Sequence, residues 1–270
     1  MSTERATPNT PEWAALAPHH LARYLFAAEL AAGKRVLDAG TGAGYGAALL
    51  QNAGAQEVRA IDIDAASIAA AQQSFPLPNL TFLTDDCHTL AHITGPFDLI
   101  TNFENIEHLP HPEKFLARAA ELLGGGGTLL ISTPDRANTP PFINGKPANP
   151  YHHHEWTRDE FLSLLSPHFK YIDMRIQVQS HALASRLTAV DSLRQGLSWS
   201  NPVATFLWRK LARTNPSPTT RSTRSYKSLE ALAAPTPADY PIVTPALAAI
   251  HGTPYCHFAL CKTQPSSQPL

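Results

Sequence analysis

The chain has 270 residues, of which 43% are hydrophobic and 16% charged, and its 21 Lys and Arg residues nearly balance its 22 Asp and Glu residues. This length can bury a substantial core, and the hydrophobic content is too high for a disordered chain. A net charge of −1 argues against a protein built mainly to bind DNA or RNA. No apolar run reaches the roughly 20 residues of a membrane span, and no secretory signal is visible. We therefore expect a cytoplasmic protein.

Short β-branched runs alternate with Ala- and Leu-rich helical patterns between residues 33 and 133. Asp64 is expected to cap a helix at 65–73, and a helix that starts at Pro112 should end at the glycine run 124–127. This alternation predicts a parallel sheet with helices on both faces. The expected strands of this half are 36–37, 58–61, 80–83, 97–100 and 128–131.

The second half begins with a Pro- and Asn-rich loop that runs to about Pro150. Thr157 and Glu160 have the spacing of a capping box, which predicts the start of another helix. Further strands are expected at 171–178 and 255–261, separated by a long insertion with a helix capped by Asn201 and Pro202.

A glycine-rich turn lies between the first expected strand and its helix, in the text VLDAGTGAGYG at 36–46. Glycines let a ligand approach the backbone, and the following helix start presents unpaired N–H groups. A dinucleotide fingerprint would need glycine at Tyr45, and a phosphate-binding P-loop would need a following Gly-Lys-Ser/Thr. Asp38 is a poor neighbour for a pyrophosphate but a good one for an ammonium group. The pattern therefore favours S-adenosylmethionine, which carries an ammonium and a sulfonium but no phosphate.

Acidic residues follow the next two expected strands. Asp62 comes directly after the second strand, where a carboxylate can accept both hydroxyls of a ribose. Asp86 follows the third strand, where it could accept the amino group of an adenine. These positions are in register with the glycine loop, which makes a nucleoside-binding edge of the sheet the favoured interpretation.

The fourth strand leads into the text NFENIEH at 102–108. If this segment is one helical turn, Glu104, Glu107 and His108 share a face. Two carboxylates and an imidazole on one face favour a bound Mg²⁺ or Mn²⁺. A metal-free role of His108 as a base and a merely structural turn remain open alternatives.

Residues 33–133 resemble a class I S-adenosylmethionine-dependent methyltransferase. The resemblance implies an α/β, Rossmann-like, doubly wound and mostly parallel sheet of seven strands, with a reversed last strand and a lid insertion before it. It places the methionine moiety by Asp38 and the loop glycines, the ribose by Asp62, and the adenine by Asp86 and Cys87. Asn102 is expected beside the cofactor as well. The segments that carry the resemblance are RVLDAGTGAGYGAALL, VRAIDIDAASIAAA, LTDDCHTL and FDLITNFENIEHLPHPEKFLARAAELLGGGGTLLISTPD, and the loop glycines are Gly40, Gly42 and Gly44.

The E-x-x-E-H text and a downstream histidine resemble the ligand pattern of metal-dependent 2′-O-methyltransferases of small RNAs. His152 matches the downstream position in the text NPYH, so it is preferred to His153 and His154. His108, aided by Glu104, is the candidate catalytic apparatus. The candidate metal ligands are Glu104, Glu107, His108 and His152.

The expected reaction is methyl transfer to an oxygen of a small molecule or saccharide. The alternatives are an RNA 2′-O-methyltransferase, against which the near-zero charge argues, and a cofactor-binding homologue without catalysis. DNA is not expected as a partner, weak contact of the basic stretch 209–227 with a membrane surface stays open, and the oligomeric state is unknown. The expected organisation is an N-terminal helical segment at 1–32, the cofactor-binding core at 33–178, a partly flexible insertion or lid at 179–254, a closing strand at 255–262 and a disordered tail at 263–270.

Overall fold

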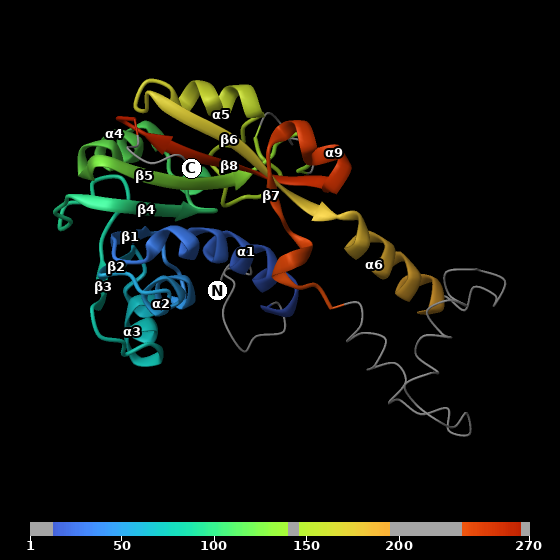
Figure 1. Cartoon of the computed structure of the whole chain (residues 1–270), viewed down its shortest axis with the longest axis horizontal. Coiled ribbons are helices and arrows are strands. Elements are labelled where there is room, and N and C mark those ends of the chain that lie inside the picture. The colour runs from blue at the N-terminus through green and yellow to red at the C-terminus, as the bar shows by residue number, and fades with distance from the viewer. Residues whose placement is uncertain (1–12, 140–145, 195–233, 266–270) are drawn as a thin grey trace.

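The computed structural model describes residues 13–139, 146–194 and 234–265. The centre of the fold is one sheet whose eight strands lie in the order β3-β2-β1-β4-β5-β8-β6-β7 (Figure 1). The strands are β1 Arg35–Ala39, β2 Glu57–Asp62, β3 Leu80–Thr84, β4 Phe97–Phe103, β5 Leu123–Pro134, β6 Tyr171–Ser180, β7 Ile242–Val243 and β8 Gly252–Lys262.

Strand directions confirm the predicted class. Strands β1 to β5 pair in parallel, and β8 runs antiparallel between β5 and β6. The reversed last strand is therefore confirmed, but the predicted count of seven is wrong, because β7 adds a short antiparallel pairing to β6. A strand of two residues is too short to produce a hydrophobic alternation, which is why the sequence pattern missed it. The glycine run 124–127, expected to lie between helix and strand, forms the start of β5.

Helices cover both faces of the sheet because neighbouring residues of each strand point to opposite sides. In β1, Val36 belongs to the core cluster that includes residues of α1, α2 and α3, whereas Leu37 belongs to the cluster that includes residues of α4 and α5. Both faces are thus buried, as expected for a parallel sheet between helical layers. The helices are α1 Trp13–Ala31, α2 Tyr45–Asn52, α3 Ala65–Ser74, α4 Pro112–Leu122 and α5 Arg158–Leu165.

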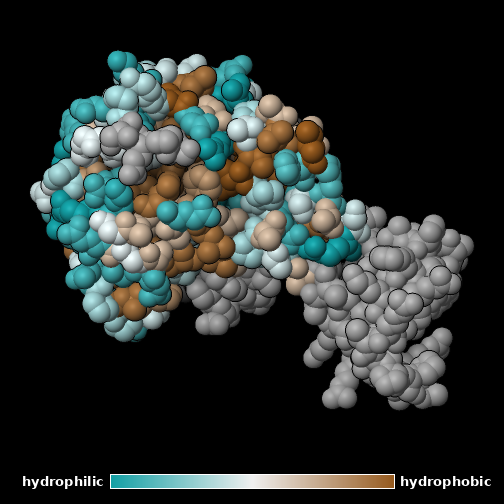
Figure 2. Space-filling model, in the orientation of Figure 1, coloured by the Kyte–Doolittle hydropathy of each residue, from teal (hydrophilic) through white to brown (hydrophobic). Residues whose placement is uncertain are grey.

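Strand β6 continues into helix α6, His181–Arg194, which leaves the body of the fold (Figure 1). The chain returns through the short turns η2 Pro237–Asp239 and η3 Pro245–Leu247 and the helix α9 Ala248–His251. Figure 2 shows apolar surface over this returning segment, where Leu247 and Ile250 are exposed. The predicted helix at Asn201 and the basic stretch 209–227 lie outside the described residues.

The strand order places a switch point between β1 and β4. From β1 the chain moves outward to β2 and β3, and then returns to β4 on the other side of β1. The loops that follow β1 and β4 therefore separate and leave a crevice at the carboxyl edge of the sheet, which is where open α/β sheets bind their ligands. Topology alone directs the search for a site to this edge.

One glycine near this edge supports a packing prediction. A Cβ at Gly46, in the first turn of α2, would overlap the ring of Tyr24 in α1. We expect Gly46→Ala to lower the free energy of unfolding by about 2 kcal/mol through overpacking, despite the better helix propensity of alanine. Urea denaturation measures this change. Gly125→Ala is the matched control, because its Cβ would lie 3.6 Å from the nearest atom, and an equal loss in both variants would contradict the packing argument.

Candidate functional site

The loop after β1 is shaped by three glycines with positive φ, at Gly40, Gly42 and Gly44. A Cβ at Gly40 would lie 2.6 Å from Cγ of Asn105, and one at Gly44 would lie 2.6 Å from Cβ of Ala71. A Cβ at Gly42 would meet nothing within 4 Å. The outer two glycines are therefore required by close packing, whereas Gly42 borders open space at the carboxyl edge of β1.

Asp38 lies beneath this loop rather than in open solvent. Its side chain is fully buried and accepts hydrogen bonds from the hydroxyls of Thr41, Thr101 and Tyr24, at 2.6, 2.7 and 3.1 Å. Burial raises the pKa of this carboxyl group, although the three hydroxyls oppose the shift. Asp38 thus joins α1, β1 and β4 below the crevice, and its direct contact with an ammonium group stays a prediction.

Asp62 lies directly beside the open glycine. One carboxylate oxygen, Oδ2, accepts the N–H of Gly42 at 2.9 Å, and the other, Oδ1, accepts the N–H of Asp64 at 2.9 Å. The predicted helix cap is confirmed, because Oδ1 of Asp64 accepts the N–H of Ala66 at 3.1 Å. The end of β2 therefore holds one carboxylate against the glycine loop, and the next carboxylate, that of Asp64, caps a helix.

The third acidic segment follows β3. Asp86 is partly exposed and accepts both the backbone N–H and Nδ1 of His88, at 2.8 and 3.0 Å. Partial burial raises its pKa, but these hydrogen bonds outweigh that effect and hold the pKa below its usual value. Burial raises the pKa of the Cys87 thiol to about 12, so this cysteine is a neutral packing residue rather than a nucleophile. Asp85 is buried and accepts a hydrogen bond from the backbone N–H of His92, which gives it a structural role.

Asn102 sits at the end of β4 and is fully buried. Its side-chain amide donates to the carbonyl of Ala39 at 2.9 Å, which ties β4 to β1 at the point where their loops separate. Because Asn102 is buried and bonded to Ala39, its contact with the cofactor stays a prediction. Sequence reasoning missed Asn105, although the structure packs it directly against Gly40.

The segment after β4 is not one helical turn. Glu104 has a φ of 50°, and the 3₁₀ turn η1 covers Ile106–His108. Glu104 therefore does not share a helical face with Glu107 and His108, and this geometric expectation is wrong. One oxygen of Glu104, Oε1, instead accepts the hydroxyl of Ser132 at 2.9 Å and lies 3.7 Å from the guanidinium of Arg23.

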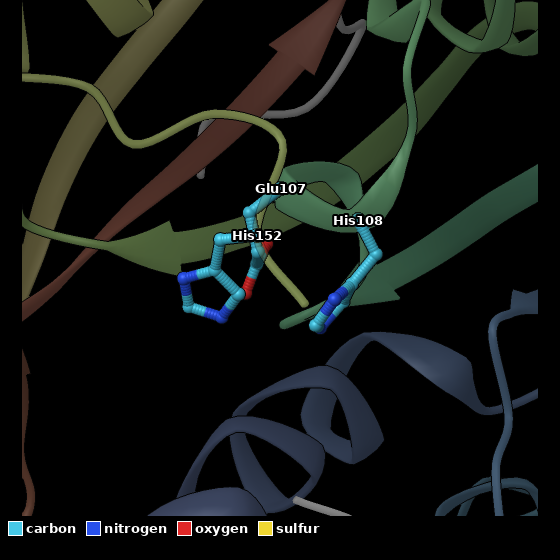
Figure 3. A group of neighbouring side chains, drawn as sticks. All are labelled: Glu107, His108 and His152. Carbon is cyan, nitrogen blue, oxygen red and sulfur yellow. The ribbon is translucent and has the colours of Figure 1, made fainter. Parts of the chain in front are cut away.

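Glu107, His108 and His152 come together at one place (Figure 3). One potential ligand atom from each lies within 4.8 Å of the others. The loop before α5 brings His152 to η1, because the N–H of His153 donates to the carbonyl of Glu107 at 2.8 Å. The structure thus unites three of the four predicted metal ligands, and Glu104 lies nearby but is not part of the group.

The carboxyl group of Glu107 is almost completely buried and accepts the hydroxyl of Thr133 at 3.1 Å. Burial and the nearby charge of Glu104 raise its pKa well above the usual value. A buried carboxylate without a neighbouring cation destabilises the fold, so a bound divalent metal would stabilise the charged form of Glu107. His108 lies with Nδ1 3.0 Å from the carbonyl of Tyr151. A carbonyl only accepts, so Nδ1 carries the proton and Nε2 is the nitrogen with the lone pair.

A buried arginine next to the site was not predicted. Arg23, in α1, is fully buried and donates to Oε1 of Gln177 in β6 at 2.6 Å. Its distance of 3.7 Å from Glu104 places a fixed positive charge below the end of β4. A single arginine in a helical pattern ordinarily indicates an exposed face, and no sequence signal marked this one.

His19 predicts how stability depends on pH. Burial and the charge of Arg23 lower its pKa from 6.5 to about 3. The unfolded chain therefore binds this proton more readily, and stability present above pH 6.5 is lost as the pH falls toward 3. We expect roughly 2 kcal/mol of this loss by pH 5, measured by urea denaturation at pH 7 and pH 5. His19→Gln should lose less stability on acidification than the wild type does. His153→Gln changes an exposed histidine and is the control, so it should lose as much stability as the wild type. Equal losses of stability in all three proteins would contradict the assignment to His19.

Comparison with known proteins identifies the family. Residues 13–188 match the family model of the methyltransferase domain, and the chain therefore belongs to this family. Its fold is that of the class I S-adenosylmethionine-dependent methyltransferases. Within the described parts of the chain, no helix is long and apolar enough to cross a membrane.

Curated relatives are also methyltransferases, and this chain aligns with only part of each one. A protein of Mycobacterium tuberculosis named a probable S-adenosylmethionine-dependent methyltransferase is 35% identical over 48% of this chain and 46% of its own. One of Mycolicibacterium smegmatis is 32% identical over 61% of this chain and 63% of its own. A ubiquinone biosynthesis O-methyltransferase of Nitrosococcus oceani is 36% identical over 39% and 45%, respectively. The chain thus spans about half the length of the first of these relatives.

Solved structures share the fold at low identity. The [4+2]-cyclase SpnF superposes with a TM-score of 0.57 at 15% identity, covering 98% of this chain and 89% of its own. The YcgJ protein of Bacillus subtilis has a TM-score of 0.53 at 15% identity, over 92% of this chain and all of its own. These likenesses show the fold alone, and the chemistry must be argued from the site.

Proposed function

We propose that the protein transfers a methyl group from S-adenosylmethionine to an oxygen atom of a small molecule or saccharide. One observation carries this proposal: the open glycine Gly42 and the carboxylate of Asp62 lie together after β1 and β2, and the group of Glu107, His108 and His152 follows β4, on the other side of the switch point of the sheet. The family match supports the methyl donor, and the similarity to a ubiquinone biosynthesis O-methyltransferase supports oxygen as the acceptor atom.

The donor set fits S-adenosylmethionine better than a phosphate-bearing nucleotide. Gly42 has room for a ligand against its backbone, and Asp62 next to it can accept the two ribose hydroxyls. Asp86 is the partly exposed acid after β3 and can accept an adenine amino group, with Cys87 as an apolar neighbour. Asp38 and Asp62 both lie by the loop, and their charges would repel a pyrophosphate. S-adenosylmethionine supplies a methyl group on a positively charged sulfur, which is already a good leaving group.

The residues of this chain must then align the acceptor and remove its proton. The acceptor oxygen forms a bond to the methyl carbon while the carbon–sulfur bond breaks, and the sulfur retains the electron pair and becomes neutral. Holding the two atoms near 3–3.5 Å supplies much of the rate enhancement. The proton of the hydroxyl needs a destination, and Nε2 of His108 can accept it, since Nδ1 already donates to Tyr151.

Glu107, His108 and His152 also fit a divalent cation, because one buried carboxylate and two imidazoles lie within 4.8 Å of one another. Mg²⁺ or Mn²⁺ bound there would lower the pKa of the acceptor hydroxyl. His108 would then be a ligand instead of the base, so the two roles exclude each other. The burial of Glu107 favours the metal, because a bound cation would offset the charge of its carboxylate, and Glu104, held by Ser132, supplies a second negative charge nearby.

An open hollow of about 540 Å³, with both polar and apolar lining, supports a saccharide acceptor. Glu155, which lines it, also accepts from Nδ1 of His152 at 2.9 Å, so the hollow adjoins the histidine of the site. An indole together with charged groups of both signs suits a polyhydroxylated ring better than an apolar chain. The lining residues are Arg136, Glu155, Trp156, Asp159, Glu160 and Ser163.

The acceptor class is tested by incubating the protein with S-adenosylmethionine labelled in the methyl group and with separate metabolite, saccharide and RNA fractions, each with and without Mg²⁺. We expect label in the saccharide or metabolite fraction. Label confined to the RNA fraction would establish the 2′-O-methyltransferase alternative instead. A product whose label is released as a methylamine on hydrolysis would exclude oxygen as the acceptor atom.

A further inference from the structure

His152 stands at the centre of a hydrogen-bond chain that runs from the backbone of Tyr151 to the side chain of Thr139. The N–H of Tyr151 donates to Oδ1 of Asn149 at 3.0 Å, which fixes the orientation of this amide. The Nδ2 group of Asn149 therefore faces Nε2 of His152, at 3.0 Å. On the other side of the ring, Nδ1 lies 2.9 Å from Oε1 of Glu155, whose Oε2 accepts the hydroxyl of Thr139 at 2.7 Å.

These contacts determine the tautomer of His152. An amide nitrogen only donates, so Nε2 of His152 accepts from Asn149 and carries no proton. A carboxylate accepts, so the proton of the neutral ring is on Nδ1 and points to Glu155. Glu155 is buried, which means that this bond acts in a low-dielectric surrounding and is shielded from water.

We propose that the Asn149–His152–Glu155 chain is a positioning device for the metal ligand His152. Glu155 orients the ring, fixes the proton on Nδ1 and makes Nε2 the stronger donor. Asn149 covers Nε2 until a divalent cation displaces its amide. This inference rests on the metal site of the proposed function and adds Glu155 and Asn149 as residues that act on the ligand rather than on the metal.

The two residues should therefore act in opposite directions. A carboxylate behind a metal-bound histidine commonly raises metal affinity 10- to 100-fold. Glu155→Gln retains the shape of the side chain but removes its charge, so a purely structural role would leave the affinity unchanged. Removing the Asn149 amide deletes a bond that competes with the metal, and a bond of this kind corresponds to about a fivefold change in affinity.

The experiment titrates Mn²⁺ into the full chain and follows the loss of the free-ion spin resonance signal. We expect Glu155→Gln to bind Mn²⁺ about 10-fold more weakly than the wild type, and Asn149→Ala to bind it about fivefold more tightly. His153→Ala is the control, because this exposed neighbour is not part of the metal group, and it should bind as the wild type does. Weaker or unchanged binding by Asn149→Ala, or wild-type binding by Glu155→Gln, would overturn the proposal.

A second readout needs no metal. In protein labelled with ¹⁵N histidine, two-bond ¹⁵N–¹H spectra distinguish the tautomers, and His152→Gln identifies the signal. We expect the Nδ1–H form in the wild type and a growing share of the Nε2–H form in Glu155→Ala. An unchanged tautomer in this variant would overturn the inference alone. Absence of Mn²⁺ binding both in the wild type and in Asn149→Ala would overturn this inference together with the metal part of the proposed function, leaving the methyl donor untouched.

Discussion

Replacing Asp62 by alanine should remove binding of S-adenosylhomocysteine, the product of the donor. The carboxylate at the end of β2 lies beside the open Gly42 and accepts its N–H group, so the side chain that shapes the loop is also the one proposed to bind the ribose. Losing charge-assisted hydrogen bonds to two hydroxyls should weaken the affinity at least about 100-fold. Isothermal titration calorimetry measures the change.

The neighbouring Asp64 provides the matched control. Its carboxylate accepts the N–H of Ala66 and caps α3, so Asp64→Ala should cost about 1 kcal/mol of stability and retain the affinity. Asp62→Asn retains one acceptor oxygen and should bind with intermediate strength, which separates ribose contact from collapse of the loop. An affinity of Asp62→Ala within a few fold of the wild type would contradict the cofactor assignment.

The second large effect is expected at Glu107. Glu107→Gln removes a buried carboxylate from the proposed metal group, so transfer of the methyl group should fall about 100-fold or more. The same change should leave stability without metal unchanged or higher, because burial already raises the pKa of Glu107 and disfavours its charge. Labelled-methyl transfer and thermal unfolding, each with Mn²⁺ and with EDTA, measure the two effects.

Glu113→Gln is the control for this variant, because Glu113 is an exposed acid at the start of α4 and should change neither readout. EDTA should inactivate the wild type and have no further effect on Glu107→Gln. Full activity of the wild type in EDTA would remove the metal and leave His108 as the base. Lower metal-free stability of the variant would show that Glu107 is a structural group rather than a metal ligand.

The regular elements of the fold were predictable because their signals are local. The Asp64 cap and the capping box of Thr157 and Glu160 each depend on residues three or fewer positions apart, and the structure confirms both. The alternation of strands and helices likewise follows from short hydrophobic patterns, and the order of βα units then places the crevice at the ends of β1 and β4.

Contacts between distant parts of the chain were not predictable in the same way. Arg23 meets Gln177 across 154 positions, and neither residue belongs to a motif that would indicate burial. Helical spacing predicted that Glu104 would share a face with Glu107. The positive φ of Glu104 instead turns the chain before η1 begins, and its side chain bonds to Ser132. The pairing of His152 with η1 was expected from a resemblance, and the bond from His153 to the carbonyl of Glu107 supplies its physical cause.

Transfer of a labelled methyl group from S-adenosylmethionine is the most direct test of the central proposal. The wild type and Asp62→Ala are compared in the acceptor fraction, with the S-adenosylhomocysteine formed counted in parallel. We predict that the wild type produces one S-adenosylhomocysteine for each methyl group found in the acceptor, and that Asp62→Ala produces neither. Tight binding of S-adenosylhomocysteine by the wild type with no label in any fraction would contradict catalysis and identify a cofactor-binding protein without turnover.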